Sequence, residues 1–478
     1  VAVGDGDHTS PRWSPDGKRL AYVSSSEGGK AQVYVRWQSG GAIAEITDLT
    51  EAPSELEWSP DGSSIAFPPF TPDETAKLGE ASPKPEGAQW AEPMEVITDV
   101  TYRADGAGYL KPGFRHVYVV AADGGTPRQL TFGAFNESGP ISWSPDGQQL
   151  FVAGNRKDNW QRDPLNSELY EVALRDAAIR PITDRVGPDR APAVSPDGSM
   201  IAYLGFDDRY LGYQNVRLYV MDRKSHQTRS LTDGLDRTID ALAWAGDGRS
   251  ILVSYVDHGV TKVARVQLDG RRDVVAEGLA GEPIDRPYAG GKFSVARDGT
   301  VAFTHGTPQS LPGVAVERKG RTRQLTQLNE GALADKTLAA VRPLQLVSSF
   351  DKRPIDAWIV TPPDFDRTRK YPLILEIHGG PFAAYGPTFS TDYQLYAAAG
   401  YVVVYANPRG STSSGEEFAN LIHHNYPSDD YDDLMSVVDA AIAQGFVDEN
   451  ALFVTGGSGG GALTAWIVGR TNRFKAAA

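Results

Sequence analysis

A phrase of the type Trp-Ser-Pro-Asp-Gly, followed by apolar residues, recurs through the first two thirds of the chain, as in "WSPDGKRLAYV" from Trp13 and "WSPDGQQLFV" from Trp143. Proline presets φ for a turn, and glycine accepts the left-handed conformation that closes it. Each copy therefore predicts a β-hairpin. The six copies place their glycines at Gly17, Gly62, Gly147, Gly198, Gly248 and Gly299.

The spacing of these copies limits the fold to a repeat architecture. Successive glycines are 45, 85, 51, 50 and 51 residues apart, and a step of about fifty residues is typical of one four-stranded propeller blade. A second phrase precedes most hairpins, as in "AEITDLT", "RQLTFG", "RPITDR", "RSLTDG" and "RQLTQL". Two landmarks per period predict a β-propeller, which we place at residues 1–335.

The step of 85 residues is too long for one blade. Residues 68–94, which begin "PPFTPDETAKLGEASPKPEG", are rich in proline and charge and predict a loop inserted into an otherwise normal blade. Closed propellers usually have about four to eight blades. We expect seven in the complete protein, with the first blade missing from this sequence.

From about Val341 the pattern changes to that of an α/β domain, which we place at residues 336–478. "YPLILEIHGG" (371–380) and "YVVVYANPRGS" (401–411) are apolar runs that end in glycine-containing loops, as parallel strands buried on both faces do. In "SDDYDDLMSVVDAAIAQGF" the apolar residues recur at helical spacing. They are Leu434, Val437, Val438, Ala441 and Ile442.

An acidic run stands where this helix should begin. Its members are Asp429, Asp430, Asp432 and Asp433. Negative charge is favourable at a helix N-terminus because it complements the helix dipole. We expect the run to serve the helix in this way rather than to bind a metal ion.

The strand "ALFVT" (451–455) runs directly into Gly456-Gly457-Ser458-Gly459-Gly460, and "ALTAWIVG" follows as a helix. Strand, G-x-S-x-G and helix together predict a sharp turn that presents Ser458 as a nucleophile. A phosphate-binding loop is the alternative. No lysine follows as a P-loop requires, and no G-x-G-x-x-G with a suitable acidic residue fits, so we favour the nucleophile.

The "WSPDG" repeats, followed in order by "EIHGGPF", "NPRGS" and "GGSGGG", resemble the prolyl oligopeptidase family of serine peptidases, nearest its acylaminoacyl-peptidase branch. The resemblance implies a β-propeller followed by an α/β-hydrolase domain, of which residues 336–478 would be the first part. It implies that Ser458 is the acylated nucleophile and that the backbone N–H of Gly459 is one oxyanion donor. Relatives often carry a side chain at that position, but the group required is a backbone N–H.

The second oxyanion donor is expected from the loop "HGGPF". Pro381 has no N–H, so Gly379 or Gly380 must supply it, and we favour Gly380. His378 is expected to shape this loop rather than to act as the general base.

The triad of such hydrolases runs Ser, Asp, His along the chain. The residues after Ser458, "GGGALTAWIVGRTNRFKAAA", contain neither Asp nor His. His423 and His424 lie upstream of Ser458, and we do not expect either to substitute for the base. We expect the triad Asp and His to lie in a longer polypeptide from which this sequence is taken.

The resemblance implies peptide hydrolysis through an acyl-enzyme, with the propeller restricting access to short peptides. Release of N-acylated amino acids is our first expectation, and a carboxypeptidase-like or general oligopeptidase specificity is the nearest alternative. Two readings lie outside peptidases. One is an esterase, and the other is a non-enzymatic binding module similar to the propeller of the TolB protein, with a decayed hydrolase domain.

Composition excludes several other classes of protein. The net charge of −14 argues against a nucleic-acid or anionic-membrane partner, and no apolar run approaches the ~18 residues of a membrane span. Without cysteine there is neither a disulfide nor a thiolate metal site. The first residues show no signal-peptide pattern. We expect a cytoplasmic protein that needs no cofactor or metal and can form a homo-oligomer.

Overall fold

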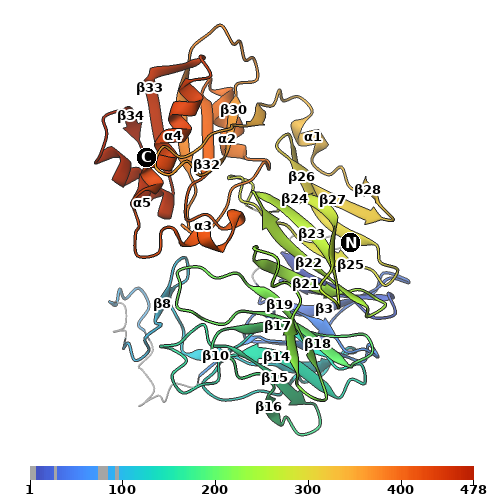
Figure 1. The fold of residues 1–478 in the computed structure, drawn as a ribbon. Coiled ribbons are helices and arrows are strands. Elements are labelled where there is room, and N and C mark those ends of the chain that lie inside the picture. The colour runs from blue at the N-terminus through green and yellow to red at the C-terminus, as the bar shows by residue number, and fades with distance from the viewer. Residues whose placement is uncertain (1–6, 26–28, 74–83, 92–95, 282) are drawn as a thin grey trace. The chain divides into compact units, whose positions relative to one another are not determined.

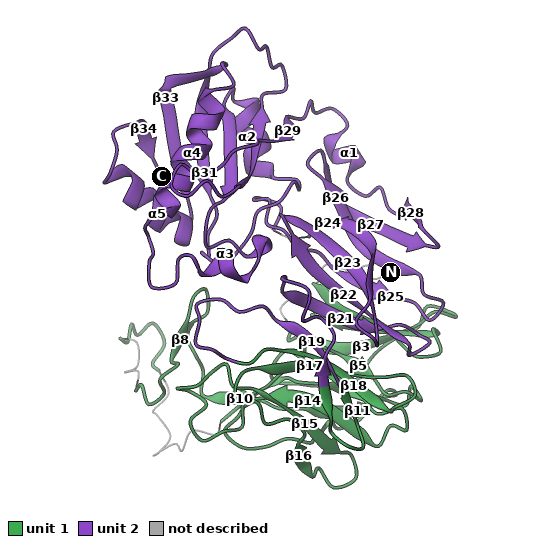
Figure 2. Cartoon of the chain, in the orientation of Figure 1, with its two compact units in different colours: residues 1–207, 221–228 green, residues 208–220, 229–478 purple. Residues whose placement is uncertain are grey.

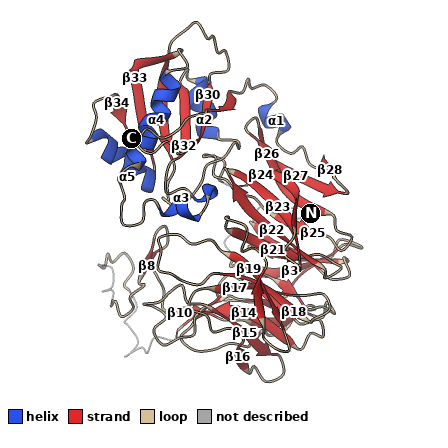
Figure 3. Ribbon diagram, in the orientation of Figure 1, coloured by secondary structure: helices blue, strands red, loops and turns tan. Residues whose placement is uncertain are grey.

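The computed structural model describes residues 7–25, 29–73, 84–91, 96–281 and 283–478 (Figure 1). The chain divides into two compact units (Figure 2): unit 1 comprises Val1–Asp207 and Met221–Thr228, and unit 2 comprises Asp208–Val220 and Arg229–Ala478. Within the described ranges, helices occur only from Glu330 onward (Figure 3). None of those helices is long and apolar enough to cross a bilayer.

Antiparallel sheets, each built around four strands, account for the chain before that point, as the repeats predict. Three of them have the orders β1-β2-β3-β4, β12-β11-β6-β5 and β13-β14-β15-β16. Their strands are β1 (His8–Trp13), β2 (Arg19–Ser24), β3 (Gln32–Trp37), β4 (Ile43–Glu45), β5 (Glu57–Trp58), β6 (Ser64–Phe67), β11 (Tyr118–Ala121), β12 (Arg128–Gln129), β13 (Glu137–Trp143), β14 (Gln149–Gly154), β15 (Glu168–Ala173) and β16 (Ile179–Pro181).

A fourth sheet has the order β17-β18-β19-β20, and the last two sets of strands join into one eight-stranded sheet. The join is a single pair, Leu279 with His305. The strands are β17 (Asp189–Val194), β18 (Met200–Gly205), β19 (Arg217–Asp222), β20 (Thr228–Ser230), β21 (Ile239–Trp244), β22 (Ser250–Asp257), β23 (Val260–Gln267), β24 (Arg272–Leu279), β25 (Phe293–Val295), β26 (Val301–Thr307), β27 (Ser310–Arg318) and β28 (Arg321–Gln324). This propeller-like arrangement confirms the predicted fold class, while the number of seven blades stays a prediction.

Every predicted hairpin joins the first and second strands of its set. In β13–β14 the Ser144 hydroxyl donates to Asp146 Oδ1 at 2.5 Å and accepts the N–H of Gln149 at 3.0 Å. Asp146 also accepts the N–H of Gln148. These bonds to the charged form hold the pKa of Asp146 below its ordinary value. Serine and aspartate therefore close the turn with their own side chains.

In five of the six sets the second phrase forms the outer strand and the residues after it, and its threonine hydroxyl accepts a backbone N–H of the same set. Leu218 N–H, for example, donates to Thr232 Oγ1 at 3.0 Å. The same bond recurs from Val33 to Thr47, from Val117 to Thr131, from Leu169 to Thr183 and from Val314 to Thr326. Threonine recurs because its hydroxyl satisfies a backbone donor of the neighbouring strand.

The tryptophan that opens the phrase connects successive sheets of unit 1. Trp58 Nε1 donates to the carbonyl of Arg12 at 2.9 Å, and Trp143 Nε1 donates to the carbonyl of Glu57 at 3.2 Å. Each acceptor directly precedes the tryptophan of the previous copy. A buried indole needs a partner for its N–H, and the repeat supplies that partner.

The insertion extends further than the predicted residues 68–94. It occupies the chain between β6 and β11, because a strand with the apolar pattern of the blade resumes only at Tyr118. Its described residues form two small ribbons, β7 (Phe70–Pro72) with β10 (Gly113–Arg115) and β8 (Arg103–Ala104) with β9 (Gly108–Tyr109). Residues 74–83 and 92–94 of the predicted loop lie outside the described residues. The blade itself is otherwise normal, as predicted.

A six-stranded sheet of order β29-β30-β32-β31-β33-β34 follows, with helices packed against it. Strands β32, β31, β33 and β34 run parallel, as predicted for the apolar runs. The elements are α1 (Glu330–Leu333), β29 (Ala340–Pro343), β30 (Asp356–Thr361), β31 (Tyr371–Ile377), α2 (Thr391–Ala398), β32 (Val402–Asn407), α3 (Glu416–Asn420), α4 (Asp430–Ile442), β33 (Val447–Gly456), α5 (Gly459–Val468) and β34 (Phe474–Ala477).

The core of this sheet joins Leu373, Leu375 and Val404 to the predicted apolar face of α4. Of that face, Leu434, Val437, Val438 and Ala441 are fully buried and Ile442 packs beside them. The predicted domain boundary at 335/336 falls between β28 and β29, inside unit 2. That boundary stays a prediction.

We expect Thr232→Val to lower the free energy of unfolding by about 1–3 kcal/mol, because the Leu218 N–H would lose its partner in a buried position. Thr228→Val, at an exposed position of β20, is the matched control and should change stability by less than about 0.5 kcal/mol. Urea unfolding of the three proteins makes the comparison. Equal stability of the two variants would contradict the role assigned to the threonine.

Candidate active site

The turn between β33 and α5 holds Ser458 in a strained conformation. Ser458 has φ 55° and ψ −118°, its side chain is exposed, and it stands at the N-terminus of α5. A positive φ is unusual for a residue with a side chain and is typical of a serine presented by a strand–turn–helix elbow. The structure therefore places Ser458 where the sequence predicted it, at the carboxyl end of a central parallel strand.

Two glycines let this turn pass close to β31. A Cβ on Gly460 would lie 2.1 Å from the carbonyl oxygen of Ile377, and a Cβ on Gly456 would lie 2.9 Å from the same atom. Both distances are shorter than real Cβ contacts. Glycine is required at both positions because the end of β33 and the start of α5 leave no space for a side chain against β31.

The loop after β31 meets the same turn. A Cβ on Gly379 would lie 3.4 Å from Ser458 Cβ, and a Cβ on Gly459 would lie 3.1 Å from Gly380 N. The Gly379 N–H donates to Tyr288 Oη at 2.8 Å. The structure thus brings together Ser458, Gly459 and Gly380, the three site residues chosen from the sequence. Their roles in catalysis stay predictions.

His378 lies beneath this loop and is 4% exposed. Its Nδ1 is 2.8 Å from the carbonyl oxygen of Gly379, and its Nε2 is 2.8 Å from Ser411 Oγ. Burial lowers the pKa of His378 and favours the neutral ring. Both ring nitrogens are used within the loop region, which agrees with a loop-shaping role.

His423 and His424, which precede Ser458 in the chain, also make contacts of their own. His423 Nδ1 accepts the N–H of Gly212 at 3.0 Å. The His424 ring lies against it, with the ring centroids 3.9 Å apart. This geometry ties His423 to a segment of unit 2 that precedes β19.

Glu376 is a buried carboxylate two residues before His378. It is 1% exposed, accepts hydrogen bonds from Tyr385 and Tyr393, and lies 3.2 Å from Arg286 Nε. Burial raises the pKa of Glu376 to about 7. The sequence did contain a signal for this residue, because Glu376 is the one charged position in the apolar run "YPLILEI".

Arg409 and Asp433 form a second buried ion pair under the site. Arg409 Nε and Asp433 Oδ2 are 2.9 Å apart, and Arg409 Nη2 and Asp433 Oδ1 are 2.8 Å apart. Two residues before Arg409, the side chain of Asn407 forms hydrogen bonds with both backbone groups of Tyr385.

Within the acidic run, Asp430 accepts backbone N–H groups at the start of α4, as a helix start requires. Sequence reasoning missed the different role of Asp433.

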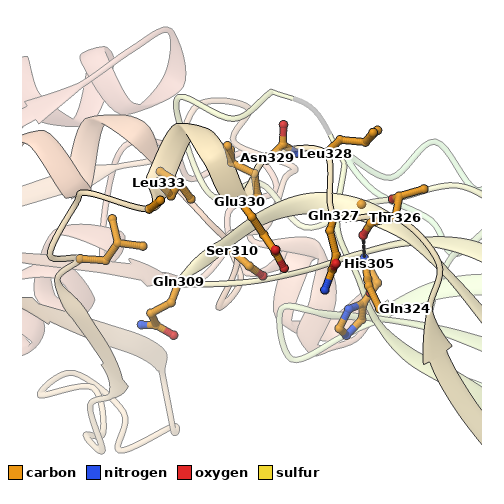
Figure 4. Close-up of a pocket in the computed structure, with 14 residues that line it drawn as sticks. His305, Gln309, Ser310, Gln324, Thr326, Gln327, Leu328, Asn329, Glu330 and Leu333 are labelled. Carbon is orange, nitrogen blue, oxygen red and sulfur yellow. Dashed lines mark hydrogen bonds between the residues drawn. The ribbon is translucent and has the colours of Figure 1, made fainter.

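Two of the several cavities within unit 2 bear on the location of the candidate site. One, of about 730 Å³, is lined by Tyr288, Ala383 and Ala384 beside the loop, and by Asp240 and Lys292 of the β-sheet part. The other, of about 420 Å³, is formed by residues of β26–β28 and α1, with Gln309, Asn329 and Leu333 among its side chains (Figure 4). Its lining includes neither Ser458 nor the loop after β31, whereas the first cavity is lined by residues of that loop.

Comparisons with known proteins agree with this arrangement. Residues 387–478 match the model of the prolyl oligopeptidase family, and residues 86–203 match that of the dipeptidyl peptidase IV N-terminal region. The chain is 32% identical to the uncharacterized peptidase YuxL of Bacillus subtilis, over 99% of this chain and 72% of that protein. It is 26% identical to dipeptidyl-peptidase 5 of Porphyromonas gingivalis, over 98% of this chain and 68% of that protein.

Among solved structures, the acylaminoacyl peptidase of Pyrococcus horikoshii superimposes with a TM-score of 0.81 at 21% identity. The match covers 98% of this chain and 69% of that one. At this identity it shows that the two proteins share a fold.

We expect Gly460→Ala to lower the free energy of unfolding by about 2–4 kcal/mol, because the methyl group would overlap the Ile377 carbonyl and force the start of α5 away from β31. Gly331→Ala is the matched control, since a Cβ there meets nothing within 4 Å in helix α1. That variant should be as stable as the parent or more stable by up to about 1 kcal/mol. Chemical unfolding distinguishes the two. A Gly460→Ala protein of unchanged stability would show that the turn can relax.

The free energy of unfolding should fall as pH rises from about 4.5 to about 7, in part because of Glu376. Its pKa is about 7 in the folded protein, against an ordinary 4.5. In this window the folded state holds a proton that the unfolded state has lost, so rising pH favours unfolding.

In Glu376→Gln this contribution disappears. The slope of the free energy of unfolding against pH should then be less negative than in the parent protein by up to about 1.4 kcal/mol per pH unit. Urea unfolding at pH values across the window measures it, with the exposed Glu449→Gln as control. Parallel curves for Glu376→Gln and the parent would contradict the pKa shift.

Proposed function

Because this chain belongs to the prolyl oligopeptidase family of serine peptidases, we propose that it hydrolyses short peptides through an acyl-enzyme formed on Ser458. The observation that carries this proposal is the meeting of the strained Ser458 turn with the glycine loop after β31. A serine exposed in such a turn can attack a carbonyl carbon held above the sheet.

The oxyanion of the tetrahedral intermediate would be bound by the N–H groups of Gly459 and Gly380. A Cβ on Gly459 would lie 3.1 Å from Gly380 N, so the two residues are close enough to serve one oxygen atom. The alternative donor, Gly379, gives its N–H to Tyr288. This supports the choice of Gly380.

The cavity of about 730 Å³ supports short peptides as the substrate class. It is bounded by the loop residues Ala383 and Ala384 on one side and by β-sheet residues on the other. A folded protein would not fit a space of this size.

Within this class we propose the release of N-acylated amino acids. The cavity carries one acidic and one basic side chain, Asp240 and Lys292. Their charges offset each other, so the cavity lacks the net negative charge that would select a free ammonium group. The shared fold of the Pyrococcus horikoshii acylaminoacyl peptidase is a second support.

Release of dipeptides is the second candidate. The proteins named dipeptidyl-peptidase 5 are 25–30% identical to this chain. In the cavity, the Asp240 carboxylate is the group that an N-terminal ammonium would contact. The two candidates differ in one substrate feature, the charge at the N-terminus.

The test compares N-acetylated, free-amino and C-terminally blocked peptides as substrates of the protein expressed from its complete gene. We expect the N-acetylated class to be cleaved with the highest kcat/KM, and casein to be cleaved far more slowly than any short peptide. Ser458→Ala should abolish every activity and prevent covalent capture of a fluorophosphonate.

Dominance of the free-amino class would favour dipeptide release, and dominance of peptides with a free C-terminus would favour a carboxypeptidase-like enzyme. If the parent protein neither cleaves peptides nor captures the fluorophosphonate, the peptidase proposal fails. The binding-module reading would then replace it.

A further inference from the structure

A segment of the β-sheet part, residues 284–289, is bonded along its length to the α/β part of unit 2. Thr391 N–H donates to the carbonyl of Ile284 at 2.8 Å, and Gly386 N–H donates to that of Pro287 at 2.8 Å. In return, Ala289 N–H donates to the carbonyl of Ala384 at 2.9 Å. The segment is therefore fixed to the loop that follows β31.

Tyr288 reaches from this segment to the candidate oxyanion loop. Its hydroxyl accepts the Gly379 N–H at 2.8 Å, and a Cβ on Gly379 would lie 3.2 Å from that hydroxyl and 3.4 Å from Ser458 Cβ. The Tyr288 ring packs edge-on against Tyr385, with centroids 4.7 Å apart. Tyr288 is thus held by packing while its hydroxyl holds a backbone group beside the nucleophile.

Arg286 of the same segment contacts the other side of the site. Its Nε is 3.2 Å from Glu376, and its Nη1 would be 2.8 Å from a Cβ on Gly457. The ion pair with a buried carboxylate limits the movement of the guanidinium. Arg286 and Tyr288 together hold the turn before Ser458 and the loop opposite it.

Neighbouring peptides in a glycine loop rotate easily, so the direction of each N–H needs a cause. We propose that Tyr288 is a positioning residue: by accepting the Gly379 N–H it fixes the orientation of the loop in which Gly380 offers its N–H to the oxyanion. The inference rests on the proposed function. It adds to the residues proposed for catalysis one that lies outside the α/β-hydrolase sheet. Tyr288 acts through the loop and forms no bond to the reacting atoms.

The test is Tyr288→Phe in the protein expressed from its complete gene. Phenylalanine keeps the ring against Tyr385 and removes only the hydroxyl, which accepts the Gly379 N–H. We expect kcat to fall about ten- to a hundredfold with KM changed less than about twofold, because the loss affects transition-state binding. A peptide boronate, which mimics the tetrahedral intermediate, should bind more weakly by a similar factor.

Tyr371→Phe is the matched control. The Tyr371 hydroxyl also accepts a backbone N–H at 2.8 Å, from Asp366, but it lies at the opposite end of β31. This variant should keep the parental kcat and boronate affinity. Rates normalised to sites titrated with a fluorophosphonate, together with thermal midpoints, correct for any unfolded fraction.

The outcomes separate the two proposals. A parent protein that cleaves peptides, with Tyr288→Phe within twofold of it in kcat, would overturn the positioning role alone. A rise in KM at constant kcat would also overturn it, since it would make Tyr288 a substrate-binding residue. An inactive parent protein would overturn the proposed function and this inference with it.

Discussion

The site depends on the closeness of two backbone segments, the β33–α5 turn and the end of β31. Gly460 packs so tightly against the Ile377 carbonyl that no side chain fits between them. The parallel pairing of β31 with β33 brings both segments to the same edge of the sheet. Because each occupies the space that the other would need to relax, the positive φ of Ser458 persists.

The surroundings of this contact are stiff because buried charges are paired. Glu376 lies on the strand that ends at the loop, and Asp433 lies on the helix that covers the sheet. Each is matched by an arginine, Arg286 and Arg409 respectively. Removing one partner of such a buried pair leaves an uncompensated charge, which is costly. The loops beside the site can therefore adopt few alternative arrangements.

Much of the fold could be predicted from the sequence because its signals are local. Turn chemistry marks the hairpins, the apolar runs mark the parallel strands, and G-x-S-x-G between a strand and a helix marks Ser458. The extent of the insertion could not be predicted, because the insertion contains small ribbons such as β7 with β10 as well as loops. Arg286 and Tyr288 could not be predicted either. They reach the site through contacts between distant segments and leave no mark on their own local conformation.

Most sheets of the propeller-like part make hydrogen bonds within their own repeat, through the serine–aspartate turn or the threonine after the outer strand. A module that closes itself in this way can change in one connection without disturbing its neighbours. The long excursion between β6 and β11 is an instance, because the strands around it still form a regular sheet. That connection is accordingly a place where evolution, or a protein engineer, can graft new sequence.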